Sequence, residues 1–481
     1  MMALGLTFLL IMQYMFPAPP APAAPAAQHS DRPNIPQTAP AAIAGDVPEG
    51  VRDFQPEGDY LITVKAGEEG KNAHGYEAVF STVGGGLSSY RLLGYFRVPQ
   101  DESPENRIIM LDRFAPGRDS LRVDNVTYGA DRQNLLSTSM REAKYEIVEI
   151  PAGAVITPEP ENVTRGDKLV LRTIVGDWEL RRSYTFPANG SGADFTIPFD
   201  MEWRNLGNGS RLLNYSLVGP AGLIADDDSK QFGVINFLTA RQPSSTSPGV
   251  EIERKPLNDL TETMSDRDNR ANLAFVGAKN RFFTAIMTAS ESALTDSNGA
   301  TRLLFPADRG MIPDLKDIQT NLKFQPVITN TAVGSVPAIE EISLTVEPGT
   351  VAQGGSYKAS YLLYAGPAVD SYLAGADPRL EGVVSYTWRY FDFISRWLVQ
   401  LLTFLDGILG NYGLAIIAVT IIIKALLHPL NRKSFVSMNK MSKLAPMMKE
   451  IQKKYANDRQ KMQVEMNKFY KQNGVDRKSV V

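Results

Sequence analysis

The chain has 481 residues, 43% of them hydrophobic, which is enough material for two or three domains with a packed core. It contains no cysteine, and this excludes a disulfide framework and a thiolate metal site. The net charge of -3 is unevenly distributed, because residues 431–481 hold thirteen Lys/Arg against four Asp/Glu, a local charge of +9, and the preceding chain therefore carries -12.

This charge asymmetry is typical of a membrane protein whose last segment is cytoplasmic and whose large domain lies on the other side, since short cytoplasmic flanks collect Lys and Arg. Residues 1–16, MMALGLTFLLIMQYMF, are nearly all apolar. As a helix they would cover about 24 Å of a hydrocarbon core about 30 Å thick. We predict an uncleaved transmembrane anchor here. The alternative is a signal peptide cleaved after Ala23 or Ala26, but it would have no basic n-region and a proline inside its cleavage site.

Residues 17–50 are rich in Pro and Ala, which predicts an extended linker. Residues 51–370 then read as many short strands, separated by clusters of Gly, Pro, Asn and Asp. No strand is followed by a regular amphipathic helix, so a large antiparallel sandwich is favoured over a parallel α/β sheet. The clearest strand patterns are Asp59–Lys65, Tyr76–Thr82, Lys168–Val175, Ala193–Trp203 and Glu341–Glu347.

A sandwich of this kind could bind sugars, or act on them with a histidine and a carboxylate. The chain has only three histidines, and His29 lies in the linker while His428 lies beside the apolar run. Only His74 is left for the sandwich, so a His-based catalytic pair is not expected. The acidic run at residues 226–228 reads as a solvated turn. We therefore predict that the protein is not an enzyme and uses no cofactor or metal.

Apolar residues recur every three or four positions across residues 385–410, which predicts an amphipathic helix. Such a helix could pack on the sandwich. Its two tryptophans, and its position just before an apolar run, favour a helix lying in the membrane interface instead. We expect Trp388, Trp397 and Tyr412 to be its interfacial anchors. Residues 411–430 predict the second transmembrane helix, and the basic residues after Leu430 would hold its end in the cytoplasm.

A lysine, Lys424, interrupts this second apolar run. A charge near the middle of a membrane helix costs about 2.5–3.5 kcal/mol on the biological insertion scale. Lys424 lies six residues before Leu430, about 9 Å along a helix axis, so its long side chain could simply reach the cytoplasmic interface. The alternative is a charge that faces a polar site. The spacing alone leaves both open.

Residues 431–475 are basic and rich in methionine, with apolar residues near a heptad spacing on both sides of Asn457-Asp458. This pattern predicts a cytoplasmic helical hairpin whose first helix is kinked or restarted at Pro446. The methionines could form a plastic core or a surface for varied apolar partners, and the lysines could meet ribosomal RNA, anionic lipid or only water. The candidate contact residues are Met438, Met441, Met448, Lys449, Lys453, Lys454, Met462 and Met466.

Several stretches together resemble the bacterial membrane protein insertases of the YidC/Oxa/Alb superfamily, in their Gram-negative form. They are QYMF at residues 13–16, the Pro/Ala linker, STVGGGLSSYRLLGYF at 81–96 and YLLYAGPAVDSYLA at 361–374. The more specific stretches are GNYGLAIIAVTIIIKALLHPLNRKS at 410–434 and the basic segment 438–475. The resemblance implies a β-supersandwich in the periplasm and an inner-membrane groove whose positive charge receives the polar part of a client. It also implies membrane-protein clients, the Sec translocon, membrane lipids and a possible ribosome contact as partners, without recognition of nucleic-acid sequence.

Two features depart from this family. The groove charge is usually an arginine, and the matching Lys424 keeps the charge but not the planar set of five donors. The family also continues with three further spans, whereas this chain reads DRKSVV at residues 476–481, which we interpret as a non-native tail. We therefore expect a C-terminally truncated insertase of the bacterial inner membrane. The alternative is a membrane-anchored periplasmic carbohydrate-binding protein.

Overall fold

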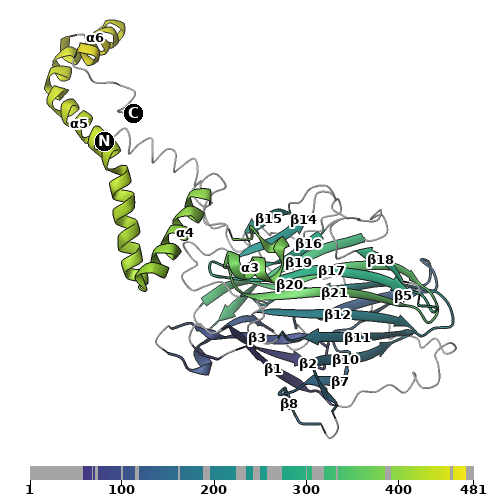
Figure 1. Ribbon diagram of the computed structural model, residues 1–481. Coiled ribbons are helices and arrows are strands. Elements are labelled where there is room, and N and C mark those ends of the chain that lie inside the picture. The colour runs from purple at the N-terminus through teal and green to yellow at the C-terminus, as the bar shows by residue number, and fades with distance from the viewer. Residues whose placement is uncertain are drawn as a thin grey trace. The chain divides into compact units, whose positions relative to one another are not determined.

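The computed structural model describes residues 58–67, 69–70, 74–98, 101–113, 119–160, 163–187, 195–223, 235–241, 250–256, 273–299, 301–305, 319–331, 334–384, 392–454 and 459–472. The described residues divide into two compact units, a β unit that ends at Val384 and a helical unit that follows it. Figure 1 shows the strands of the first and the helices of the second. The expected N-terminal anchor, the linker, Trp388 and the tail at 476–481 lie outside the described residues.

The β unit contains three sheets. In strand order, the first is β4 (Arg107–Asp112), β3 (Leu87–Phe96), β2 (Gly75–Ser81), β1 (Leu61–Gly67) and β8 (Val155–Thr157). The largest runs β15 (Glu251–Pro256), β14 (Asn236–Arg241), β16 (Leu273–Lys279), β17 (Phe283–Thr295), β21 (Ser356–Pro367), β12 (Thr196–Asn205), β11 (Trp178–Thr185), β10 (Lys168–Val175), β7 (Glu146–Pro151) and β9 (Arg165–Gly166), with β18 (Thr301–Phe305) on β17. The third is β19 (Gln319–Thr331), β20 (Gly334–Val351), β13 (Arg211–Val218), β5 (Val123–Gly129) and β6 (Leu135–Ser139).

Alternating side chains explain why these segments form strands. In β10 every second residue is buried, beginning with Leu169, and the intervening residues are exposed or half-buried. Each side of the strand therefore meets a different environment, as the two-residue period of a strand requires. The buried sides build one hydrophobic core that includes Trp178 and Trp203, which meet edge to face at 6.5 Å. Among the described strands, only the two-residue pairing of β7 with β9 is parallel, so the expected antiparallel β architecture is confirmed.

The β unit continues past β21 through α3 (Asp370–Ala376) and the short helix η5 (Pro378–Leu380). Leu373, Leu380 and Val383 are fully buried in the same core. Arg379 ties this segment to the large sheet, because its Nη1 donates a hydrogen bond of 2.6 Å to the carbonyl of Ala289 in β17. In the structure this unit therefore extends to Val384, beyond the boundary expected at residue 370.

Three helices form the described part of the helical unit: α4 (Asp392–Leu409), α5 (Tyr412–Lys454) and α6 (Arg459–Gln472). The segments expected as a second span and as the first helix of the hairpin are one helix, α5, which runs through both Pro429 and Pro446. The boundary near residue 430 was expected because apolar side chains give way to basic ones there. Such a change in the side chains does not interrupt backbone hydrogen bonding. Each proline removes the hydrogen bond to the carbonyl four residues earlier and crowds that carbonyl, but the helix continues past both positions.

Candidate functional site

A sharp corner joins the two apolar helices. Gly410 adopts φ +62°, a left-handed conformation that glycine takes without strain and that commonly ends a helix. The Asn411 Oδ1 then accepts a hydrogen bond of 3.2 Å from the backbone N–H of Leu414, which caps the first turn of α5. The sequence therefore ends α4 and starts α5 within two residues, and the two helices pack on each other.

One side of α4 carries the contact with α5. Leu398, Leu401, Leu402 and Leu405 are half-buried and follow the spacing of a single helix face. On α5, Ala415 is fully buried. Because α4 and α5 contact each other, we infer that this is the side turned towards α4. A small residue at this point lets the two backbones approach closely, as is common between membrane helices.

Lys424 lies on the opposite side of α5. It follows Ala415 by nine residues, or two and a half turns of an α-helix, so the two side chains point in opposite directions. Thr420 and His428 lie one turn before and one turn after Lys424 and are exposed, as Lys424 is. The Thr420 hydroxyl donates to the carbonyl of Ile416 at 2.8 Å. These three side chains form a polar stripe along the side of α5 that does not face α4.

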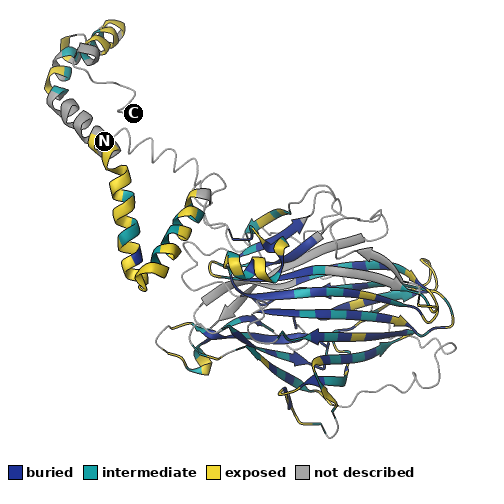
Figure 2. Ribbon diagram, viewed as in Figure 1, coloured by how far each residue is buried: buried dark blue, intermediate teal, exposed yellow. Residues whose placement is uncertain are grey.

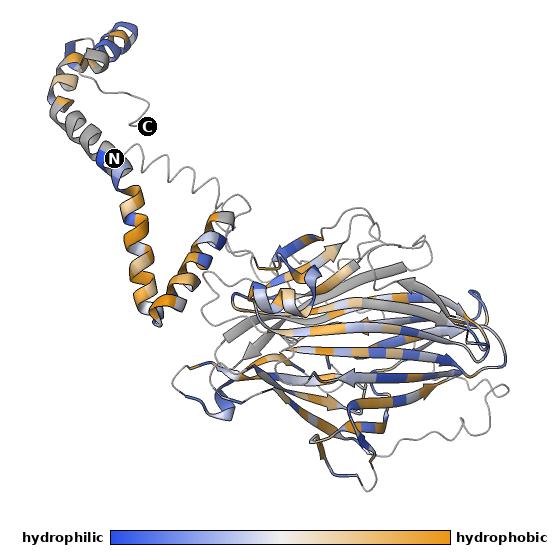
Figure 3. Ribbon diagram, in the orientation of Figure 1, coloured by the Kyte–Doolittle hydropathy of each residue, from blue (hydrophilic) through white to orange (hydrophobic). Residues whose placement is uncertain are grey.

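Most of the surface around this stripe is apolar. Figure 3 shows the first half of α5 as mostly hydrophobic, and Figure 2 shows the same stretch as mostly exposed. Within the described residues, Tyr412–Pro429 is the one helical stretch long and apolar enough to cross a membrane. Its exposed apolar side chains are Tyr412, Leu414, Ile416, Ile417, Ile421, Ile422, Leu426 and Leu427.

The expected interfacial anchors can be located in part. Trp397 of α4 is 52% exposed and Tyr412 at the start of α5 is 56% exposed. Ile394, Phe404 and Ile408 extend the exposed apolar surface of α4. A helix with a buried apolar face towards one neighbour and further exposed aromatic residues is suited to an apolar solvent such as the membrane interface.

The basic segment forms the second half of α5 and all of α6. Met448 and Met462 are half-buried, whereas Lys453 and Lys454 are exposed at the end of α5. The side chains of Met438, Met441, Lys449 and Met466 lie outside what the structure describes, and so does the turn at Asn457-Asp458. α5 and α6 contact each other. The use of these side chains as partner contacts stays a prediction.

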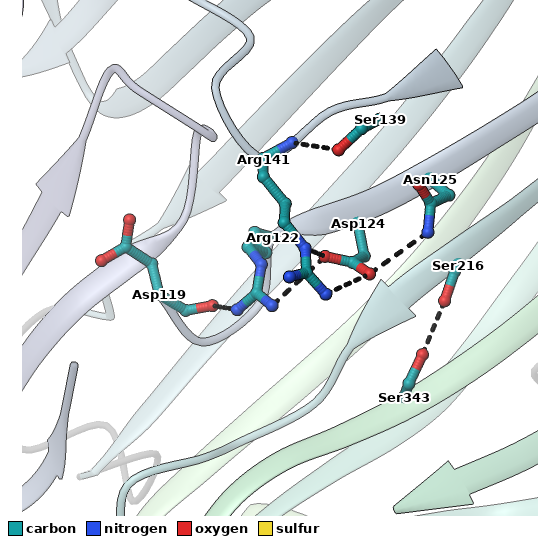
Figure 4. Close-up of polar contacts among 8 residues, drawn as sticks. All are labelled: Asp119, Arg122, Asp124, Asn125, Ser139, Arg141, Ser216 and Ser343. Atoms are coloured by element: carbon teal, nitrogen blue, oxygen red, sulfur yellow. Dashed lines mark hydrogen bonds and ion pairs between the residues drawn. The ribbon is translucent and has the colours of Figure 1, made fainter. Parts of the chain in front are cut away.

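The β unit holds a second polar cluster, which Figure 4 shows from its surface arginine to its buried carboxylates. Asp124 accepts hydrogen bonds from the buried Arg122, at 3.2 Å, and from Arg141, whose Nη2 lies 2.9 Å from Oδ2. The Arg122 Nη1 also donates to the backbone carbonyl of Asp119 at 2.8 Å. Arg113 completes the chain of charges, with its Nη1 3.9 Å from Asp119 Oδ1.

The environment moves the pKa values of the two carboxyl groups in opposite directions. Burial raises the pKa of Asp119, and the Ser88 hydroxyl and the charges of Arg113 and Arg122 only partly oppose it. Burial would also raise the pKa of Asp124. Here the hydrogen bond from Arg141 and the charges of Arg122 and Arg141 outweigh burial and hold the pKa below its ordinary value.

A second buried arginine holds the glycine-rich segment in place. Arg182 of β11 donates from Nη1 to the carbonyl of Gly85 and from Nη2 to the carbonyl of Leu121. The Tyr184 hydroxyl donates to the same Gly85 carbonyl at 3.2 Å. Gly84 and Gly85 have φ values of +76° and +62°, and Leu121 has +60°, so these contacts hold backbone conformations that side chains disfavour.

These clusters read as structural rather than catalytic. Asp119, Arg122 and Arg182 are fully buried, and they contact other side chains of the β unit and backbone carbonyls. Across the described ranges no group of His, Cys, Asp or Glu residues is arranged to hold a metal ion. Sequence reasoning missed both clusters. Arg182 and Gly85 are 97 residues apart, so no local pattern links them. Asp119, Arg122 and Asp124 are close in sequence, but no local pattern showed that these charged side chains are buried.

A family model matches part of the helical unit, and similar proteins match most of the chain. Residues 404–479 match the family described as 60Kd inner membrane protein. The chain is 28% identical over 408 residues to the membrane protein insertase YidC of a Geobacter species, which covers 83% of this chain and 63% of that protein. It is 43% identical over 113 residues to the insertase of the same name in Campylobacter jejuni, covering 24% of this chain and 21% of that protein.

The chain therefore spans less than two thirds of the length of the Geobacter relative. The expected resemblance is confirmed, and the stronger identity lies over the shorter alignments. Among solved structures, galactose 1-epimerase from Lactobacillus acidophilus matches over 64% of this chain and 99% of its own, with 10% identity and a TM-score of 0.29.

Proposed function

Because residues 404–479 match the 60Kd inner membrane protein family and most of the chain resembles insertases named YidC, we propose that this protein acts in inserting membrane proteins into the bacterial inner membrane. It lowers the barrier to transfer of a polypeptide into lipid and makes or breaks no covalent bond. The single observation that carries the proposal is the match over α5 and α6, which includes both the apolar run and the basic helices behind it.

In this proposal α4 lies in the membrane interface and α5 crosses the bilayer from Tyr412 to Pro429. An 18-residue helix is about 27 Å long, close to the thickness of the hydrocarbon core. The corner at Gly410 and Asn411 supports this arrangement, because it redirects the chain between the two helices. The β unit and the corner lie in the periplasm, and the basic end of α5 lies in the cytoplasm, as the distribution of Lys and Arg favours.

Lys424 is the client-binding charge in this proposal. Its position opposite the α4 contact supports the assignment, because a charge on that side is available to whatever packs there next. Thr420 and His428 extend the polar stripe by one turn in each direction. A cation among apolar side chains attracts the acidic or polar segment of a client and shortens the apolar distance that this segment must cross.

The second half of α5 and α6 form the cytoplasmic hairpin that first meets the client. Exposed lysines at the end of α5 suit anionic lipid headgroups or the ribosome surface, and methionine side chains adapt to varied apolar segments. The Sec translocon is a further partner that the family resemblance implies. A simple membrane anchor would need only a few basic residues after Pro429, whereas α5 continues to Lys454 and α6 follows, which argues against the carbohydrate-binding alternative.

The test is client insertion by the purified protein in lipid vesicles. We expect a deletion of the β unit that ends at Val384 to retain insertion, because the proposed site lies wholly in the helical unit. A deletion of α6, with the β unit intact, is expected to reduce insertion. If the α6 deletion inserts clients normally and the β-unit deletion does not, the assignment of the activity to the helical unit is wrong.

A further inference from the structure

The described part of the β unit has three exposed apolar side chains at one end of its sheets. Phe282 is 51% exposed in the β16–β17 turn, Val98 is 50% exposed after β3, and Val369 is 40% exposed between β21 and α3. We call these three residues the apolar tip. They come from distant parts of the sequence, so only the fold brings them to the same end.

Direct contacts place the three segments together. The backbone N–H of Ala368, next to Val369, donates to the carbonyl of Phe282 at 2.7 Å. Tyr95, three residues before Val98, meets the ring of Phe283 edge to face with centroids 5.9 Å apart. The apolar tip is therefore one surface built on shared contacts.

The turn that carries Phe282 is held rigidly. The Asn280 Oδ1 accepts hydrogen bonds from the backbone N–H groups of Phe282, at 3.0 Å, and Phe283, at 2.7 Å. The Arg281 guanidinium lies 5.0 Å from the centre of the Phe282 ring. An exposed aromatic ring beside an arginine pairs an apolar body with a cation, a combination suited to the boundary between lipid tails and anionic headgroups.

We propose that the apolar tip contacts the periplasmic surface of the lipid bilayer; this rests on the proposed function, in which α4 lies in that surface. Residues 385–391 connect Val384 to α4, and a fully extended chain of that length spans at most about 25 Å. The β unit is thus tied closely to the bilayer. The backbone N–H of Asp101 donates to the Val98 carbonyl at 3.0 Å, which places an acidic residue beside the tip. Apolar side chains, and not net charge, therefore make the contact.

Single-cysteine variants can test this contact, because the chain has no cysteine of its own. Phe282→Cys and Val369→Cys report the tip, and Phe404→Cys reports α4. Leu136→Cys is the matched control: Leu136 is 40% exposed and pairs with Tyr128, which lies against Gly176 at the opposite end of the sheets. Each variant is labelled with bimane and reconstituted as the full chain in vesicles that contain only lipid, some of it carrying a nitroxide near the headgroup.

We expect loss of bimane fluorescence at positions 282, 369 and 404, and none at position 136. The lipid contact would be overturned if position 404 is quenched but positions 282 and 369 are quenched no more than the control at position 136. The proposed function would remain intact in that case. Absence of quenching at 404 would remove the interfacial position of α4, and the proposal for the tip would fall with it.

Discussion

The Arg122 Nη2 lies 3.2 Å from Asp124 Oδ1, and both side chains are buried between the sheets of the β unit. Asp124 is also held by Arg141, so one carboxylate pairs with two guanidinium groups. A buried charge that loses its partner is destabilising because neither water nor another residue replaces it. The stability of the β unit should therefore depend on this pair more than on any ion pair at its surface.

We expect Asp124→Asn to destabilise the β unit by about 3 kcal/mol at neutral pH. Because its pKa is depressed in the folded protein, the contribution of Asp124 is present above the unfolded pKa, about 3.9, and is lost as pH falls through the folded value. The difference between the variant and the wild type should shrink below about pH 4. Glu77→Gln breaks the Lys65–Glu77 pair, whose lysine is exposed and whose glutamate is half-buried, and should cost at most about 1 kcal/mol.

Denaturant unfolding of the full chain, followed through the buried Trp178 and Trp203 with the other two tryptophans replaced by phenylalanine, measures this difference. Equal losses for Asp124→Asn and Glu77→Gln at neutral pH would contradict the buried-pair account.

Asp119 should show the opposite pH dependence. Its pKa is raised in the folded protein, so the stability it contributes is fully present below the unfolded pKa, about 3.9, and is lost as pH rises through the folded value. The free energy of unfolding of Asp119→Asn should therefore rise relative to that of the wild type as the pH increases from 4 to 7. The same fluorescence measurement at a series of pH values follows the change. A relative stability of the variant that falls over this range would show that the folded state favours the ionised carboxyl.

The third glycine of the VGGG segment is expected to be required for packing. A Cβ added at Gly86 would lie 2.6 Å from the Asp119 Cβ and 2.8 Å from the Ser120 carbonyl oxygen. We expect Gly86→Ala to cost about 1–3 kcal/mol, because the neighbouring backbone must move. At Gly209 the nearest atom is the flexible end of Arg211 at 3.5 Å, so Gly209→Ala should be nearly neutral. Thermal unfolding of both variants compares them, and equal midpoints would rule out the crowding.

Substitutions at Lys424 should separate a client-facing charge from a lysine that only reaches the interface. We expect Lys424→Arg to preserve insertion of a client with an acidic translocated segment, Lys424→Ala to impair it, and Lys424→Glu to impair it most. One charge near a membrane is worth about 1 kcal/mol, so the alanine variant should insert roughly fivefold less. Membrane extraction checks that each variant stays inserted. Normal insertion by both the alanine and glutamate variants would make Lys424 a snorkelling residue.

The proposed orientation predicts which parts a protease can reach. Added to intact spheroplasts, a protease should digest the β unit and spare the basic segment after Pro429, because Lys and Arg are retained on the cytoplasmic side. Immunoblots against a loop of the β unit and against α6 distinguish the two. Lysed spheroplasts provide the control in which both are digested. Digestion of α6 in intact spheroplasts would reverse the orientation.

Local periodicity in the sequence was enough to predict several elements. The segment Lys168–Val175 was expected as a strand and is β10 with the same bounds, because its alternation is encoded in consecutive residues. An amphipathic helix was expected before residue 411, and α4 ends at Leu409. The charge of Lys424 was also evident, since a lysine among apolar residues is a local feature. The continuity of α5 through Pro429 was not predicted, because side-chain polarity does not report backbone hydrogen bonding.

Relationships between distant residues were decided only by tertiary structure. Nothing near Gly85 indicates that Arg182 will hold its carbonyl, and nothing near Val98 or Val369 indicates that Phe282 will lie at the same end of the sheets. Spacing placed Lys424 opposite Ala415, but it did not say that α4 packs on the Ala415 side. Local patterns reflect the geometry of a single element, whereas contacts between elements depend on which buried faces can pack together and satisfy their polar groups across the whole chain.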